Sequence, residues 1–228
     1  MSQQFLKSIQ RGATAEVADA VAADPTLLSW RDANGVSGLM WSIYSGQPLI
    51  RDFFLAEKAR TGAQLEFLEA ASVGDAAALD QTPGEISELI QEFSGDGWTA
   101  LHLAAAFGTP EAVRWLLDHG APVAAVSNNA QRNQPLHAAL ALGRNPDTTR
   151  MLLDAGADPN ARQTGGFTAI FSAAAANRRD LAELLVTAGA DARIRNDFGQ
   201  DAAGYARERT HTDLADWLES QPAPATNP

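Results

Sequence analysis

The chain has 228 residues, of which 45% are hydrophobic and none is cysteine, and its formal charge is −11 at pH 7. Without cysteine there is no disulfide, thiolate metal site or cysteine nucleophile, and so acidic a chain is unsuited to nucleic acid as its main partner. No stretch reaches the ~20 apolar residues of a membrane span, and the amino terminus lacks the apolar run of a signal peptide. We therefore expect a cytoplasmic protein whose partner is neither a nucleic acid nor a membrane.

The first part of the chain, residues 1–94, predicts three irregular helical units. Each unit has a hydrophobic residue six positions before a glycine: Leu6 before Gly12, Met40 before Gly46, and Leu68 before Gly74. Glycine at this place favours a helix end, because it adopts the left-handed conformation that closes many helices. An extended connection is expected over 22–35, and an irregular insertion over 80–97.

From residue 95 onward the chain repeats one motif. The copies read GWTALHLA at 97–104, NQPLHAA at 133–139 and GFTAIFSA at 166–173. The aligned positions are His102, His137, Phe171 and Gly204, at intervals of 35, 34 and 33 residues. With the three irregular units, the chain therefore predicts seven units at a mean spacing of 33 residues.

The best-defined unit, residues 97–120, predicts a pair of helices. Thr99 suits the N-cap of a first helix through LHLAAAF, which Gly108 ends. Thr109 then caps a second helix, and Pro110 occupies its first turn, where a missing N–H costs nothing. One such pair cannot bury its apolar faces alone, so we expect the pairs to stack.

The repeat resembles the ankyrin family, whose 33-residue period carries the pattern T-P-L-H-x-A. The segments TALHLA (99–104) and QPLHAA (134–139) are similar to that pattern, as are the endings GADPNA and GADARI. The resemblance implies an all-α solenoid of about seven helix-turn-helix units, with capping first and last units. We expect a single domain at 1–220, made of irregular units (1–94), regular repeats (95–194) and a C-terminal cap (195–220), followed by a disordered tail (221–228). The irregular units resemble those of bacterial ankyrin-like proteins.

No constellation of catalytic or metal-binding residues is evident in the sequence. Equivalent positions in adjacent units should lie ~10 Å apart, whereas two nitrogens that share a zinc ion must lie within about 4 Å of each other. His102 and His137 are therefore expected to hydrogen-bond the backbone of turns and neighbouring units instead. No nucleophile elbow or phosphate-binding loop is present. We predict no catalytic residue, no metal and no cofactor.

The family resemblance implies that turn tips and first helices line a concave surface that contacts a partner protein. Transferred by position, the candidate contact residues are Tyr44, Trp98, Phe107, Asn133, Leu142, Phe167 and Phe198. Aromatic residues are enriched in interface hot spots. The alternative is that these rings pack against neighbouring turns as intramolecular cover.

Charge suggests where such a partner docks. No lysine or arginine lies between Arg60 and Arg114, whereas that stretch carries nine acidic residues. We interpret Glu85, Glu88, Glu92 and Asp96 as an acidic rim for a partner with a basic surface; a merely solvated face is the alternative. The predicted function is a monomeric, non-catalytic protein-interaction module. The alternatives are a small-molecule binder or enzyme that uses the groove as a pocket, and a self-associating scaffold.

Overall fold

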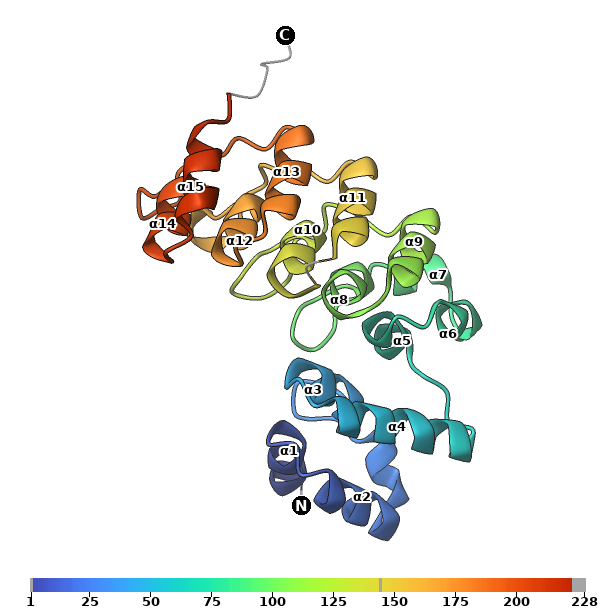
Figure 1. Cartoon of the computed structure of the whole chain (residues 1–228). Coiled ribbons are helices and arrows are strands. Elements are labelled where there is room, and N and C mark those ends of the chain that lie inside the picture. The colour runs from blue at the N-terminus through green and yellow to red at the C-terminus, as the bar shows by residue number, and fades with distance from the viewer. Residues whose placement is uncertain (1, 144, 223–228) are drawn as a thin grey trace.

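The computed structural model describes residues 2–143 and 145–222, and within these residues the chain is helical without a β-strand (Figure 1). Seven helix pairs follow one another along this part of the chain. The pairs are α1 (Ser2–Gln10) with α2 (Thr14–Ala23), α3 (Gly38–Tyr44) with α4 (Pro48–Thr61), α5 (Phe67–Val73) with α6 (Ala76–Gln81), α8 (Ala100–Phe107) with α9 (Pro110–Asp118), α10 (Pro135–Ala138) with α11 (Pro146–Asp154), α12 (Ala169–Ala175) with α13 (Arg179–Thr187), and α14 (Ala202–Glu208) with α15 (Thr212–Glu219).

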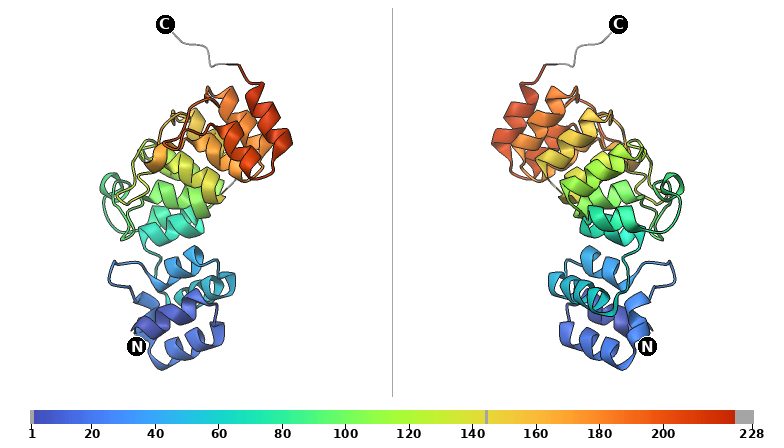
Figure 2. Two further views of the ribbon diagram at one scale, coloured as in Figure 1. Left: turned by 90° about the vertical axis from the view of Figure 1, so that its left-hand side faces the viewer. Right: turned by 90° about the vertical axis from the view of Figure 1, so that its right-hand side faces the viewer.

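Short elements complete the described chain. They are the 3-10 turns η1 (Pro25–Ser29) and η3 (Thr164–Gly166), the helix α7 (Ile86–Leu89), and the π-helical turn η2 (Ala139–Gly143) that continues α10. The pairs stack along a curved axis with α1 and α15 at opposite ends (Figure 2). First helices pack on first helices and second helices on second helices, as α5, α8 and α10 and likewise α9, α11 and α13 do. The all-α solenoid expected from the repeat is confirmed.

Five loops project beside the first helices, and each folds back on itself; we call them fingers. They span residues 31–37, 93–99, 127–133, 163–167 and 196–200. In four of them a backbone N–H donates to the carbonyl oxygen four residues later, as Ser94 does to Trp98 at 2.7 Å. The link between α4 and α5 is different, because residues 62–66 join the two helices without a finger.

The hydrophobic core divides within the second helix pair, before this short link. One cluster lies within the first two pairs and is built around Phe5, Ile9 and Phe54. A second, larger cluster runs from Met40 through α5 to Leu218 in α15. The second helix pair therefore contributes side chains to both clusters, and the link without a finger follows it.

The caps and turns expected at 97–120 are confirmed. Thr99 precedes α8, Gly108 follows it, and the Thr109 hydroxyl accepts the N–H of Ala112 at 3.3 Å. Gly120 takes a left-handed φ of 83° just beyond α9.

Two sequence expectations were wrong in detail. The connection over 22–35 is not extended throughout, because the Asp24 carboxylate accepts the N–H of Thr26 at 3.1 Å and starts η1. The alignment on Leu68 is wrong by one residue. Glu69 stands three residues after the N-cap Glu66, as His102 does after Thr99, and its carboxylate accepts the N–H of Glu66 at 3.2 Å. Of the predicted tail, residues 223–228 lie outside the described residues, and the single-domain boundaries stay a prediction.

Candidate protein-binding face

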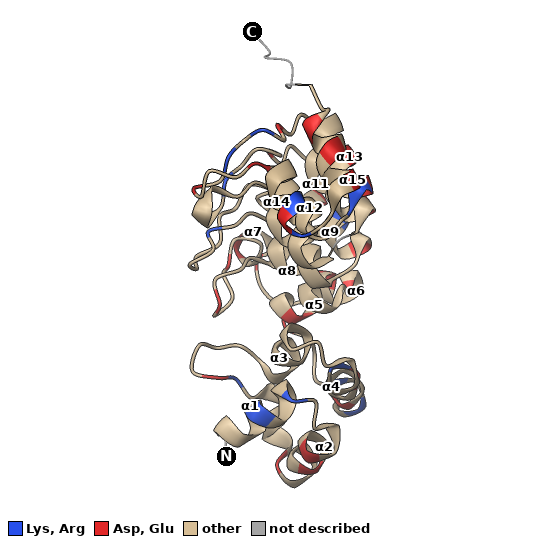
Figure 3. Ribbon diagram, turned by 60° about the vertical axis from the view of Figure 1, so that its left-hand side comes forward, with Lys and Arg blue, Asp and Glu red and all other residues tan. Residues whose placement is uncertain are grey.

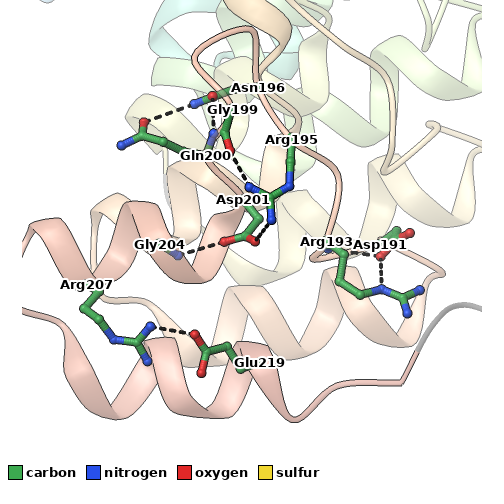
Figure 4. A network of polar contacts seen from close by, with 10 residues as sticks. All are labelled: Asp191, Arg193, Arg195, Asn196, Gly199, Gln200, Asp201, Gly204, Arg207 and Glu219. Atoms are coloured by element: carbon green, nitrogen blue, oxygen red, sulfur yellow. Dashed lines mark hydrogen bonds and ion pairs between the residues drawn. The ribbon is translucent and has the colours of Figure 1, made fainter.

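The last finger, residues 196–200, presents the most exposed large hydrophobic side chain found in the described chain. Phe198 is 73% exposed. Its backbone N–H donates at 3.0 Å to the Asn196 side-chain oxygen, which also accepts the N–H of Gln200 at 3.0 Å. The Arg195 guanidinium donates to the carbonyl oxygen of Gly199 at 2.5 Å (Figure 4). These bonds fix the turn, so Phe198 is held out toward solvent by a preorganised backbone.

The first finger, residues 31–37, uses the same arrangement. The Asp32 carboxylate accepts the N–H groups of Asn34 and Val36, both at 2.9 Å. The Arg31 guanidinium donates to the carbonyl oxygen of Gly35 at 2.6 Å. Both fingers read Arg-Asx-x-x-Gly, RDANG and RNDFG. In this shared pattern the Arg and Asx side chains hydrogen-bond the backbone of the finger. The repeat motif does not contain the pattern, and the site prediction missed it.

Neighbouring fingers are joined by backbone hydrogen bonds. Three N–H donors reach a carbonyl oxygen of the preceding finger: Asn128 to Gly97 at 2.8 Å, Thr164 to Gln131 at 3.0 Å, and Asp197 to Gly165 at 2.9 Å. An ion pair between Arg162 and Asp197 at 3.0 Å adds to the last junction. The fingers from 93–99 to 196–200 therefore form one continuous row. We call this row, together with the exposed sides of the first helices, the finger face.

Four of the predicted contact rings are half-buried, and each packs on another aromatic ring. Trp98 stacks on Phe107 with ring centroids 6.0 Å apart, and Phe107 lies 5.5 Å from Tyr44. Phe167 contacts Phe198 with a centroid distance of 6.1 Å, and it also packs on rings of α12 and α14. These rings contribute intramolecular packing and also border the finger face.

The two remaining predicted contact residues differ in exposure. Leu142, in η2, is 52% exposed. Asn133 is only 6% exposed. Its N–H donates to the Ser127 hydroxyl at 2.9 Å, and its carbonyl oxygen accepts a bond from His102 at 3.1 Å. The expectation that Asn133 reaches a partner is therefore wrong for this conformation, because the base of the finger encloses it.

The predicted acidic rim also divides in two. The Asp96 carboxylate accepts the Ser94 hydroxyl at 2.5 Å and the Tyr44 hydroxyl at 3.3 Å, so it shapes its own finger. Glu85, Glu88 and Glu92 are exposed in and around α7, and none of them forms an ion pair within the described residues. Figure 3 shows acidic but no basic residues along α5 and α6, in keeping with the sequence.

Comparison with known proteins identifies the repeat. The family model "Ankyrin repeats (3 copies)" matches residues 67–163. Residues 67–163 carry ankyrin repeats. The matched segment contains α5 through α11 and the fingers 93–99 and 127–133. Ankyrin repeats indicate a protein-interaction module. That the outlying helix pairs are repeats of the same family, and that the irregular units are of bacterial type, stays a prediction.

Two curated relatives share part of this ankyrin region. The E3 ubiquitin-protein ligase hecd-1 of Caenorhabditis elegans is 36% identical over 87 residues, which is 38% of this chain and 3% of that protein. The E3 ubiquitin-protein ligase Ufd4 of Drosophila melanogaster is 43% identical over 72 residues, which is 32% of this chain and 2% of that protein. The chain thus spans a very small part of these relatives.

The ankyrin histidines connect one repeat to the next. His102 Nε2 bonds the carbonyl oxygen of Asn133 at 3.1 Å, and its Nδ1 lies 2.8 Å from the Thr99 hydroxyl. A carbonyl only accepts, so Nε2 carries the proton and Thr99 donates to Nδ1. His137 Nε2 likewise bonds the carbonyl oxygen of Ala161 at 3.0 Å. The expectation that these imidazoles bond neighbouring backbone is confirmed.

Burial makes both ankyrin histidines weak bases. It lowers the pKa of His102 to about 4, and it lowers the pKa of His137 as well. Both rings are therefore neutral at pH 7 and serve the packing of the repeats. Among the described residues, no three histidine or carboxylate side chains gather as metal ligands would, and no helix is long and apolar enough to cross a membrane.

Proposed function

We propose that this ankyrin-repeat chain is a non-catalytic binding module that holds a partner protein against the finger face. The observation that carries the proposal is Phe198, which a fully hydrogen-bonded finger holds 73% exposed. An exposed aromatic on a rigid backbone binds with little loss of conformational entropy, and aromatics dominate interface hot spots. Leu142 and the bordering rings Trp98 and Phe107 extend the apolar surface.

The charge of the partner follows from the acidic excess of the middle units. Glu85, Glu88 and Glu92 are exposed and unpaired within the described residues, so they favour a partner with a basic surface. Such charges act mainly on the rate of encounter. A monomer in the cytoplasm is the setting that we propose. The ligase activity in the relatives' names belongs to proteins of which this chain matches at most 3%, and we do not transfer it.

Differential capture from the native host tests the proposal. Wild-type chain and the variants Phe198→Ser, Leu142→Ser and Leu49→Ser are used as bait, and bound proteins are quantified by mass spectrometry. Leu49 is the matched control, because it is 70% exposed but lies in the first turn of α4, the second helix of its pair, away from the fingers. A partner should be retained by wild type and Leu49→Ser and lost with Phe198→Ser. A partner retained equally by all four baits would place the contact elsewhere.

The same complex tests the acidic rim. Association should slow as salt rises, because charges are screened beyond ~8 Å at physiological ionic strength. Changing Glu85, Glu88 and Glu92 to lysine should lower the association rate more than it raises the dissociation rate. If neither salt nor charge reversal changes the association rate, the acidic residues do not attract the partner and are only a solvated surface.

A further inference from the structure

A groove of about 760 Å³ opens between the second helices α4 and α6, where the stack lacks a finger. Other second helices pack directly on one another, as α2 does on α4, α6 on α9 and α9 on α11. The five-residue link 62–66 joins α4 to α5 without a finger, and α4 and α6 stand apart. Figure 3 shows these helices on the side of the molecule opposite to the projecting fingers.

The lining of the groove is mostly apolar. Leu55, Leu65 and Val73 supply the larger side chains, and Ala59 and Ala76 leave room for close approach. A volume of several hundred cubic ångströms with an apolar lining is ample for side chains of a binding partner.

The charges at the groove are one-sided. Its one cation among the lining residues, Lys58, is buried and paired with the Glu69 carboxylate of α5 at 3.1 Å. Asp75 and Glu111 stand exposed at the rim, and neither forms an ion pair within the described residues. The groove therefore offers an apolar floor and two carboxylates without an ion-pair partner among the described residues. Its lysine, Lys58, is neutralised by Glu69.

We propose that this groove binds an amphipathic, basic α-helix of a partner protein. Helices that dock in apolar grooves do so through residues at i, i+3, i+4 and i+7, and α4, with 14 residues, offers a wall about 21 Å long for such a helix. Lysine or arginine beside the apolar stripe of the ligand would face Asp75 and Glu111. This site is separate from the finger face and does not depend on the function proposed for it.

Fluorescence anisotropy with defined peptides tests the site. The probe is a labelled helical peptide of about fourteen residues, the length of α4, with leucine at i, i+3, i+4 and i+7 and lysine elsewhere among alanines. Its counterpart carries glutamate in place of lysine. The full chain should bind the basic peptide at least about tenfold more tightly than the acidic one, a difference of about 1.4 kcal/mol. Equal binding of both peptides, or no binding of either, overturns the proposal.

Variants locate the bound peptide. Ala59→Trp fills the groove and should weaken binding at least about tenfold, whereas Ala77→Trp, on an exposed position of α6 that does not line the groove, should not. Asp75→Asn with Glu111→Gln should weaken binding of the basic peptide about fivefold, a total of about 1 kcal/mol, because both exposed ion pairs with the peptide are lost. Melting temperatures confirm that each variant folds.

Two further measurements distinguish the groove from the finger face and from a contact between two copies of the chain. Phe198→Ser should leave peptide binding unchanged, and loss of binding with it would assign the peptide to the finger face. Sedimentation velocity of wild type and Ala59→Trp tests for a second copy in the groove. A dimer that only Ala59→Trp abolishes would make the occupant another chain of this protein and overturn the proposal of a basic helix.

Discussion

Two buried threonines show how one hydrogen-bond partner changes the contribution of a hydroxyl group to stability. Thr99 and Thr168 both precede a first helix, and each is 1% exposed. The Thr99 hydroxyl bonds His102, whereas the Thr168 hydroxyl has no partner, because Phe171 occupies the histidine position. A buried hydroxyl without a hydrogen-bond partner loses its hydration, and no protein hydrogen bond offsets that cost.

The two threonines therefore respond differently to valine. Thr99→Val should lower the free energy of unfolding by about 1–2 kcal/mol, since it strands the His102 Nδ1 and removes a cap. Thr168→Val should leave it unchanged or raise it slightly. Urea denaturation of both variants measures the difference. Equal losses at the two positions would mean that the histidine contact contributes nothing.

The buried His102 makes stability depend on acid. Its pKa is about 4 when folded and about 6.5 in an unfolded chain. Between these values the unfolded chain binds more protons, so the free energy of unfolding falls as pH falls, by up to about 3 kcal/mol. His102→Gln should reduce this loss between pH 7 and pH 4.5. Leu103→Ala, in the same helix, destabilises the fold without a titrating group and should keep the wild-type slope. A slope unchanged by His102→Gln would contradict the assignment.

At the scale of helices, the buried ion pair between Lys58 and Glu69 fixes the junction of α4 with α5. The two side chains are 7% and 1% exposed, and one Glu69 oxygen has no hydrogen-bond partner. Removing one member leaves a buried charge, so Lys58→Met or Glu69→Leu should each cost about 3–5 kcal/mol. The double variant should recover most of that loss. Glu183→Leu, which breaks an exposed pair with Arg179, is the control and should have a much smaller effect. If the double variant instead loses as much free energy of unfolding as the two single variants together, the two charges do not interact.

Between fingers, close approach of two backbones requires a glycine. Gly97 has a φ of 87°, and an added Cβ would lie 2.5 Å from the carbonyl oxygen of Asn128 in the next finger. Gly120 has a similar φ of 83° but free space around it. Gly120→Ala should cost about 1–2 kcal/mol through backbone strain alone, and Gly97→Ala should cost about 1–3 kcal/mol more. Thermal melting compares them, and equal losses would mean that the fingers separate freely.

The sequence predicted helix pairs well where the deciding interactions are local. Thr99, Gly108 and Pro110 act through their own backbone, so their roles can be read from residue type and spacing. The sequence alignment of the third unit was wrong at Glu69. A buried carboxylate in the histidine position depends on an ion pair with Lys58, which lies in another helix pair. The exposure of Phe198 follows from bonds within its own finger, which the RNDFG pattern signals but the repeat motif does not. The burial of Asn133 depends on His102 of the preceding repeat, so the spacing of Asn133 within its own unit does not predict it.

At the scale of the whole molecule, the stack of helix pairs has a finger face on one side and an apolar groove on the other. The finger row is joined by backbone hydrogen bonds, whereas the groove lies where the short link 62–66 interrupts the regular packing. The aligned residues Met40 and Leu68 lie 28 residues apart, less than the mean spacing of 33. This short interval accompanies the interruption, but it does not predict the separation of α4 from α6.

The most direct test of partner binding at the finger face uses the protein that wild type captures and Phe198→Ser does not. Hydrogen–deuterium exchange of the chain is measured alone and in complex with that protein. We predict slower exchange in the fingers 93–99, 127–133, 163–167 and 196–200, with the second helices α9, α11 and α13 unchanged. Protection confined to the second helices, with exchange in the fingers unaltered, would contradict the assignment of partner binding to the finger face.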